Sequence, residues 1–397
     1  MARFKTLDQA DVAGKRVLVR ADLNVPMKAG VVGDATRLQR LAPTLRTLAS
    51  KGAKVVVLSH FDRPKGKRVP EMSLAPVAQK LSQILGQTVA FADDCIGPDA
   101  QKIVSGLSNG QIAVLENLRY HKGEEANDPL FARNLAALGD VYVNDAFSAA
   151  HRAHASTEAI THLLPAFAGL QMQAELEALA AALESPQKPV MAIVGGSKVS
   201  TKLDLLSNLV ARVNVLVIGG GMANTFLFAQ GIDVGNSLCE RDLVDTARQV
   251  LAKATAMGCQ IILPQDVVIA DALKSGAASA VVTIDSIPPA KMILDVGPAS
   301  TQTIIHQLGL CKTLLWNGPV GAFETKPFDQ ATMGIAHAAA SLTKAGLLVS
   351  IAGGGDTVAA LNAANVSSDF TYMSTAGGAF LEWLEGKELP GVKALAG

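Results

Sequence analysis

The sequence has few cysteines, few aromatic residues and no long apolar run. Only four cysteines occur among its 397 residues, widely spaced and without a CxxC pair: Cys95, Cys239, Cys259 and Cys311. This usage favours buried free thiols over a disulfide framework or a zinc site. No apolar stretch reaches the roughly 18 residues of a membrane span, and residues 1–14 lack the apolar core of a secretory signal. We therefore expect a cytoplasmic protein with no membrane partner.

Two familiar nucleotide-binding signatures are also missing. The chain contains neither the GxxxxGK[ST] pattern of a P-loop nor the GxGxxG pattern of a dinucleotide-binding fold. The nearest approach, Gly196 followed by Ser197 and Lys198, lacks the spacing that wraps a P-loop around a phosphate. This excludes an ordinary P-loop enzyme.

The formal net charge is zero, with 35 basic and 35 acidic residues, so the chain lacks the basic excess of a nucleic-acid-binding protein. Residues 1–170 nevertheless carry 21 Lys and Arg against 16 Asp and Glu. The arginines are dispersed and not in a run, which favours a small, highly anionic ligand over nucleic acid. Random variation of surface charge is the alternative explanation.

Apolar runs rich in β-branched residues alternate with segments of helical period along the chain. In the first half such runs occupy 16–23, 54–60, 111–119 and 140–147, and after Pro189 they recur at 189–196, 213–221, 260–270, 312–321 and 347–356. Nearly continuous apolar strands are typical of a parallel sheet covered on both faces. A chain of 397 residues exceeds the size at which a single hydrophobic core keeps growing, so we expect two domains. The sequence therefore predicts an α/β fold of two doubly wound, Rossmann-like domains, joined by a long helix from Gly169 and a hinge.

The residues that follow the predicted strands differ between the two halves. Those in the first half are mostly charged or amide side chains: Arg20, Asp22, Asn24, His60, Arg63, Glu116, Asn117, Arg119, Asn144 and Asp145. Those in the second half are mostly glycines. Because ligands of open α/β sheets bind beyond the carboxyl ends of the strands, we expect a small polyanion on the first half and a nucleotide on the second.

The segment 349–358, VSIAGGGDTV, joins an apolar strand to a helix start through three glycines and Asp356. Glycines let backbone N–H groups approach phosphate oxygens, and a helix N-terminus adds partial positive charge. Asp356 is a candidate ligand for Mg²⁺ bound to those phosphates. A glycine-rich turn without a ligand is the alternative, but similar clusters at 195–202 and 218–222 favour one nucleotide pocket.

These residues lie in eight ordered motifs, through which the chain resembles the phosphoglycerate kinase family over its whole length. The motifs are VRADLNVP from Val19, SHFDRPKG from Ser59, LENLRYHKGEE from Leu115, YVNDAFSAAHRAHAST from Tyr142, VGGSKVSTK from Val194, LLWNGPVGAFE from Leu314, IAGGGDT from Ile351 and STAGGAFLEWLEGKELPGV from Ser374.

The resemblance implies a reversible phosphotransferase. The acyl phosphate of 1,3-bisphosphoglycerate passes to Mg-ADP, giving 3-phosphoglycerate and Mg-ATP, by in-line transfer in an interdomain cleft that closes. It implies a 3-phosphoglycerate-binding domain at 1–170, with the tail 385–397 packing back on it, and a nucleotide-binding domain at 171–384. The implied molecule is a monomer whose ligands are ADP or ATP and 3-phosphoglycerate or 1,3-bisphosphoglycerate, with Mg²⁺ as the cofactor.

The resemblance also assigns residues to roles. Those implied to bind the phosphoglycerate are Asp22, Asn24, Arg37, His60, Arg63, Arg119 and Arg152. Those implied to neutralise the transferring phosphoryl group are Arg20, Lys198 and Lys202. Those implied to bind the nucleotide are Gly195, Lys202, Gly219, Gly220, Pro319, Glu324, Gly353, Gly354, Gly355 and Asp356, of which Asp356 also binds the metal. Because positions four apart share a helix face, we expect Lys198 and Lys202 to point into one site. We expect His151 and His154 to order the site or to pack near it, not to form a phosphohistidine.

Two positions depart from the family pattern. The usual HLGRP reads HFDRP, with Phe61 and Asp62, and the usual STGGGA reads STAGGA, with Ala376. We expect the Asp62 carboxylate to face solvent or to pair with Lys65 or Lys67, since it would repel a bound anion.

Two other functions remain as alternatives: a nicotinamide-dependent dehydrogenase, and a nucleotide sensor without catalysis.

Overall fold

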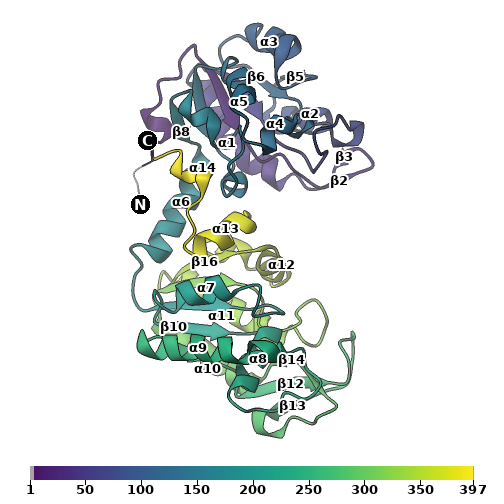
Figure 1. The fold of residues 1–397 in the computed structure, drawn as a ribbon, viewed down its shortest axis with the longest axis vertical. Helices are drawn as coiled ribbons and strands as arrows, with labels where there is room; N and C mark the ends of the chain where they lie inside the picture. Colours follow the sequence, from purple (N-terminus) through teal and green to yellow (C-terminus); the bar gives the residue numbers. More distant parts are fainter. Residues whose placement is uncertain (1–3, 397) are drawn as a thin grey trace. The chain divides into compact units, whose positions relative to one another are not determined.

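The computed structural model describes residues 4–396, and contacts divide the chain into two units (Figure 1). Unit 1 comprises Met1–Leu176 with Glu388–Gly397, and unit 2 comprises Glu177–Lys387. The outermost residues of the expected domains, 1–3 and 397, lie outside the described residues. In the described part of the chain, no helix combines the length and apolarity needed to cross a membrane.

Unit 1 is built on a six-stranded parallel sheet in the order β5-β6-β4-β1-β7-β8. Its strands are β1 (Arg16–Arg20), β4 (Lys54–Leu58), β5 (Val89–Ala92), β6 (Ile112–Leu115), β7 (Val141–Asn144) and β8 (Ala166–Ala168). A short antiparallel hairpin pairs β2 (Met27–Lys28) with β3 (Val31–Val32). From β1 the chain proceeds through β4 to β5 and then returns through β6 to β7 and β8 on the other side of β1, so the crossovers place helices on both faces of the sheet.

Alternate residues of these strands enter two separate cores, which explains why the runs are apolar at nearly every position. Val17 and Val19 pack in the cluster that contains Leu45 of α1 (Thr36–Ser50). Leu18, between them, packs in the opposite cluster with Leu135 of α5 (Pro129–Ala136). The other helices are α2 (Ala75–Leu85), α3 (Gly97–Ser105) and the one-turn α4 (Lys122–Glu125).

Unit 2 repeats the plan with the parallel order β11-β10-β9-β15-β16-β17. Its strands are β9 (Val190–Val194), β10 (Val215–Ile218), β11 (Gln260–Ile262), β15 (Thr313–Asn317), β16 (Val349–Gly353) and β17 (Tyr372–Ser374). Its helices are α7 (Leu203–Leu209), α8 (Gly221–Ala229), α9 (Val244–Ala256), α10 (Pro298–Leu310), α11 (Gln330–Lys344), α12 (Gly355–Ala363) and α13 (Gly378–Leu384). The prediction of two doubly wound α/β sheets is confirmed.

The run 260–270 differs from its predicted form as one strand of the parallel sheet. It divides at Pro264 into the edge strand β11 and the strand β12 (Asp266–Ala270). Strand β12 is the centre of a second, antiparallel sheet, between β13 (Ser279–Thr283) and β14 (Met292–Val296). Proline lacks the N–H that would continue the ladder, so the chain leaves the first sheet there.

The predicted long helix is α6 (Leu170–Leu183), which begins directly after β8. The end of the chain adds α14 (Pro390–Lys393) to unit 1, where the Gly391 amide donates to the Ala150 carbonyl at 2.8 Å. Pro390 starts this helix, because the first helical position needs no N–H and suits the fixed φ of proline.

Candidate active site

The basic cluster of unit 1 is centred on Arg20, at the carboxyl end of β1. Its side chain is completely buried. Nε donates to the Ser156 hydroxyl at 2.8 Å, and Nη2 lies 3.0 Å from Nδ1 of His60, which follows β4. Since β1 and β4 are parallel neighbours, their carboxyl ends bring these two polar side chains together, as the sequence predicted.

Positive groups crowd this cluster and repel one another. Burial, followed by Arg20 and Arg119, holds the pKa of His60 well below its usual range. Burial, followed by Arg119 and Arg20, lowers the pKa of His154 from 6.5 to about 4. Arg152 opposes protonation of both histidines. A site that disfavours further positive charge in this way is prepared for an anionic ligand.

Arg119 adds a donor that the protein satisfies only in part. Its side chain is 4% exposed, Nη1 donates to the Asp62 carbonyl at 2.8 Å, and buried Nε makes no protein hydrogen bond of good geometry. Oε1 of Glu125 lies 3.4 Å from that Nε. Burial lowers the pKa of Arg119. A buried guanidinium whose Nε lacks a well-oriented partner is suited to donate a hydrogen bond to a carboxylate or phosphate oxygen of a ligand.

A second polar group of unit 1 joins Arg37 to Asp22. The Arg37 Nη1 atom lies 2.9 Å from both carboxylate oxygens of Asp22 and donates to the Asn24 carbonyl at 2.7 Å. Ser148, which no sequence argument selected, donates to Asp22 through its hydroxyl at 2.5 Å. The Asn24 side chain accepts the Asp62 amide at 3.0 Å. These contacts hold Asp22 and Asn24 in fixed orientations next to the ends of β1 and β4.

The unusual segment HFDRP fits its surroundings. Phe61 is buried in the core that contains Val55 and Val57. Asp62 has φ +51°, a left-handed conformation that aspartate adopts more readily than most residues with a Cβ. Its side chain is exposed, as expected, and so is that of Arg63. The change from the usual glycine therefore leaves the backbone path intact and adds no inward-facing carboxylate.

Several polar residues at strand ends serve the fold. The Glu116 carboxylate accepts the Leu74 amide at 2.8 Å at the start of α2. Asp145 accepts the Gln171 amide at 2.8 Å at the start of α6. The Asn117 side chain accepts the Phe61 amide at 3.0 Å, next to His60. They position neighbouring segments, so polar side chains at strand ends also support the fold.

Sequence reasoning missed Glu124, which lies under the basic cluster. Its carboxylate is fully buried and accepts both the Ser156 amide at 3.0 Å and the Ser156 hydroxyl at 2.6 Å. Ser156 in turn accepts Nε of Arg20. Burial raises the pKa of Glu124, whereas the nearby charge of Arg20 lowers it. No periodic signal distinguishes this glutamate from the exposed acids around it in the sequence.

In unit 2, Lys202 is held at the ends of two strands. Its Nζ atom donates to the Gly195 carbonyl, after β9, at 2.8 Å and makes a short contact with the Asn317 side-chain oxygen, at the end of β15. Burial lowers the pKa of Lys202 from 10.5 to about 8, although Asp356 raises it. Asn317, which was not selected from the sequence, also donates to the Gly353 carbonyl at 2.8 Å.

The expectation that Lys198 and Lys202 share a helix face is wrong. The segment 198–202 is a turn, and Lys202 is the cap residue before α7. Lys198 is exposed, whereas Lys202 is half-buried. The close approach of Gly195 to Pro319, where a Cβ would lie 1.8 Å from the carbonyl oxygen, fixes the path of this loop. Tertiary contact therefore overrides local helical spacing.

The glycines of unit 2 serve two different purposes. Gly195 and Gly219 have no space for a Cβ because the 319–320 backbone lies against them, and Gly353 packs against the ring of Phe380. At Gly355, the first residue of α12, nothing lies within 4 Å of the Cβ position. The first three glycines are thus required by the fold, and only the last lies at an open helix N-terminus.

A cavity of about 450 Å³ in unit 2 is lined by four of the ten residues expected to bind the nucleotide. Gly220, Pro319, Glu324 and Asp356 line it. Apolar side chains and backbone supply much of the remaining wall: Leu238, Leu273, Met292, Ile293, Leu294, Val296 and Val320. An apolar pocket with a few polar groups at its rim is the usual form of a site for a flat ring joined to a polar tail.

Asp356 lies in the first turn of α12, exposed at the edge of this cavity. A single carboxylate beside an open helix N-terminus suits Mg²⁺ that is bound mainly by phosphate oxygens.

The second departure from the family pattern, Ala376, is buried at 7% exposure and has no positive φ, so its methyl group fits without strain.

The chain is similar to one family of known proteins over nearly its whole length. The family model "Phosphoglycerate kinase" matches residues 7–387. The chain is 63% identical to a phosphoglycerate kinase of Caulobacter vibrioides over 392 residues, 99% of each chain. It is 61% identical to one of Azorhizobium caulinodans over 395 residues, 100% of each. The solved phosphoglycerate kinase of Coxiella burnetii is similar with a TM-score of 0.93 and 44% identity, over 99% of both chains. That of Pyrococcus horikoshii OT3 has a TM-score of 0.82 and 29% identity, over 98% of both.

Proposed function

The chain belongs to the phosphoglycerate kinase family, and from that premise we propose how its residues carry out the reaction. The reaction is the reversible transfer of a phosphoryl group between 1,3-bisphosphoglycerate and ADP, which gives 3-phosphoglycerate and ATP. Family membership removes the dehydrogenase and the non-catalytic sensor as alternatives. We propose where each of the two ligands binds and which role each side chain has.

The phosphoglycerate binds the basic cluster of unit 1. The observation that carries this assignment is the concentration of buried positive groups there, with Arg119 left partly unsatisfied and two histidines held neutral. Arg37, Arg63, Arg119 and Arg152 act as clamps on the carboxylate and phosphate. Asp22 and Asn24, held by the Arg37 contacts, accept or share hydrogen bonds with the glycerate hydroxyl. Guanidinium groups suit these partners because they bind oxyanions in a bidentate way.

The nucleotide binds the cavity of unit 2. Its base occupies the apolar wall, Glu324 receives the ribose, and its phosphates lie at the open N-terminus of α12. Asp356 is the protein ligand of Mg²⁺, which offsets the charge of the nucleotide phosphates when it is bound. Arg20 and Lys202 neutralise charge on the transferring phosphoryl group. Phosphoryl transfer depends on such positioning and charge stabilisation more than on proton chemistry.

Lys198 has the weakest support of the three proposed cations, because its side chain is exposed. Lys202 is ordered by the Gly195 and Asn317 oxygens. Lys202→Ala should lower kcat by roughly a hundredfold or more, with a smaller change in nucleotide affinity, as expected of a contact made in the transition state. Lys198→Ala is the matched comparison and should lower kcat less.

Calorimetric titration of the full chain with each ligand tests the division between the units. Alanine at Arg37, Arg119 or Arg152 should weaken 3-phosphoglycerate binding by about 1.5 to 3 kcal/mol and leave ADP binding nearly unchanged. Arg133→Ala removes an exposed arginine on α5 and is the control. Equal losses for both ligands would contradict the assignment.

Two further predictions complete the proposal. We propose that the chain acts as a monomer, which light scattering on the purified protein tests. We also propose that it works in the cytoplasm, which cell fractionation tests.

A further inference from the structure

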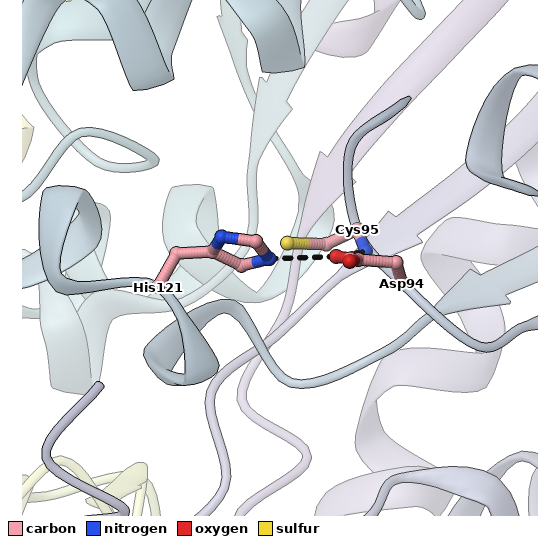
Figure 2. Close-up of side chains that lie close together, drawn as sticks. All are labelled: Asp94, Cys95 and His121. Atoms are coloured by element: carbon pink, nitrogen blue, oxygen red, sulfur yellow. Dashed lines mark hydrogen bonds and ion pairs between the residues drawn. The ribbon is translucent and has the colours of Figure 1, made fainter. Parts of the chain in front are cut away.

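Unit 1 contains a group of three potential metal ligands that the proposed reaction does not use. Asp94 and Cys95 follow β5, and His121 precedes α4. Their ligand atoms all lie within 4.8 Å of one another. Figure 2 shows the Cys95 sulfur, the His121 imidazole and the Asp94 carboxylate directed toward a common point. We propose that these three side chains bind one thiophilic divalent cation of the Zn²⁺ class.

The chemistry of the donors favours Zn²⁺ over Mg²⁺. One thiol sulfur, one imidazole nitrogen and one carboxylate oxygen are the three ligand types that proteins offer to Zn²⁺, whereas Mg²⁺ takes oxygen ligands almost exclusively. Three protein ligands leave a fourth position of a tetrahedral site for water. The site is thus distinct in its metal preference from the one assigned to Asp356.

The burial of the three residues suits a cation that enters from solvent. Cys95 is completely buried. The side chains of His121 and Asp94 are 29% and 39% exposed. Sulfur therefore forms the inner wall, and the two other ligands line the approach from solvent. Water at the fourth position would lie on the exposed side.

Neighbouring contacts already orient the ligands. The His121 ring stacks on Phe131, with centroids 5.2 Å apart and planes inclined by 28°. Its Nε2 atom lies 2.7 Å from Oδ1 of Asp94, and the same oxygen accepts the Cys95 amide at 2.6 Å. Cation binding replaces the Nε2–Oδ1 hydrogen bond with two metal bonds. The thiol proton passes to solvent and the imidazole carries its single proton on Nδ1, because the metal requires a thiolate and the lone pair of Nε2.

Zn²⁺ titration of the nucleotide-free protein, in competition with a chromophoric chelator, tests the proposal, since nucleotide phosphates would bind the metal themselves. Co²⁺ provides a second readout through the absorption of a thiolate–cobalt bond. The wild type should bind Zn²⁺ at this site without competition from Mg²⁺. Cys95→Ser and His121→Asn should each weaken it by at least about tenfold, in line with the effect of losing even indirect support at a metal site.

Cys239→Ser is the control, because it removes a half-buried thiol from unit 2. It should leave Zn²⁺ affinity and the cobalt–thiolate band unchanged, whereas Cys95→Ser should abolish the band. If Cys95→Ser fails to fold, His121→Asn provides the same test at a partly exposed residue. Unchanged affinity in the ligand variants, or no thiolate band in the wild type, would overturn the proposal and leave an Asp94–His121 pair beside a buried thiol.

Discussion

The hydroxyl of Ser156 donates a hydrogen bond to the carboxylate of Glu124 at 2.6 Å, in a fully buried environment. The same hydroxyl oxygen accepts Nε of Arg20 at 2.8 Å. Ser156 therefore connects Glu124 to the guanidinium of Arg20 and helps to hold it in place. We assign this guanidinium to the transferring phosphoryl group. This makes Ser156 and Glu124 positioning residues, since neither is proposed to touch the ligand.

Ser156→Ala should cost about 1 to 3 kcal/mol of unfolding free energy, because it leaves buried hydrogen-bonding groups of Arg20 and Glu124 without this partner. It should also lower kcat while KM for 3-phosphoglycerate changes little. Ser156→Thr keeps the hydroxyl and should recover part of both losses. Urea unfolding and steady-state kinetics check the two effects. A loss of stability with unchanged kcat would show that the contact serves the fold alone.

The lowered pKa of Lys202 predicts an alkaline limb in the rate. Its pKa is about 8 in the folded protein, so the cation is lost as pH rises through that value. We expect kcat/KM for ATP to fall above pH 8. Because the unfolded state holds this proton up to about 10.5, Lys202 also makes unfolding free energy rise with pH between 8 and 10.5. The pH profile of the free enzyme checks the first expectation.

Asn317→Asp tests the assignment of that limb to Lys202. The new carboxylate would contact the ammonium group and stabilise its charged form. The limb should therefore move to higher pH. Thr343→Ala, on α11, is a control that should not move it. A limb that stays in place in Asn317→Asp would assign it to another group.

The neutral histidines predict a link between pH and anion binding. The pKa of His154 is lowered to about 4, so it is uncharged in the free protein at neutral pH. A bound phosphoglycerate adds negative charge beside it and should raise the pKa values of His154 and His60. Histidine NMR titrations with and without 3-phosphoglycerate measure this shift. Exposed His162 is the internal reference and should not respond.

The lowered pKa of His154 also determines the direction in which the free energy of unfolding changes with pH. Between pH 6.5 and 4 the unfolded chain binds a proton at residue 154 that the folded chain does not. The free energy of unfolding that this difference contributes is present above pH 6.5 and is lost as the pH falls toward 4. His154→Gln should flatten the dependence of unfolding free energy on pH in that window. An unchanged slope would place the effect on other groups.

Much of the fold could be predicted because the inner parallel strands, such as β6, β7, β9 and β15, are fully buried and appear in the sequence as continuous apolar runs. The strands β5, β8 and β17 were not predicted, because they are short and only partly buried. The glycine clusters and the strand-end arginines indicated the two proposed sites because they lie in short local motifs directly after the predicted strands. The relation of Glu124 to Ser156 could not be found, since these residues lie 32 positions apart and nothing local distinguishes Glu124 from Glu125. The turn at 198–202 was missed because the contact of Gly195 with Pro319 decides it.

The end of the chain supports unit 1, although unit 2 precedes it in the sequence. Leu389 and Leu395 are each 1% exposed, and the Gly391 amide donates to the Ala150 carbonyl. Ala150 follows the short helix Phe147–Ala149, next to His151 and Arg152. The tail therefore packs beneath a segment that carries proposed ligand-binding residues.

Deletion of residues 387–397 should lower the melting temperature of unit 1 and weaken 3-phosphoglycerate binding, whereas ADP binding stays nearly unchanged. Gly391→Val is the finer test, because a Cβ at this position would lie 2.9 Å from the Ala150 Cα and could not be accommodated without a shift of backbone. We expect it to cost about 1 to 3 kcal/mol, as overpacking does. Lys393→Ala, whose side chain is 67% exposed, is the matched control and should fall within about 0.5 kcal/mol of wild type. Calorimetry that finds the unit 1 transition unmoved in both the deletion and Gly391→Val would show that the tail adds nothing to unit 1, and the proposed support of the ligand-binding segment would fail with it.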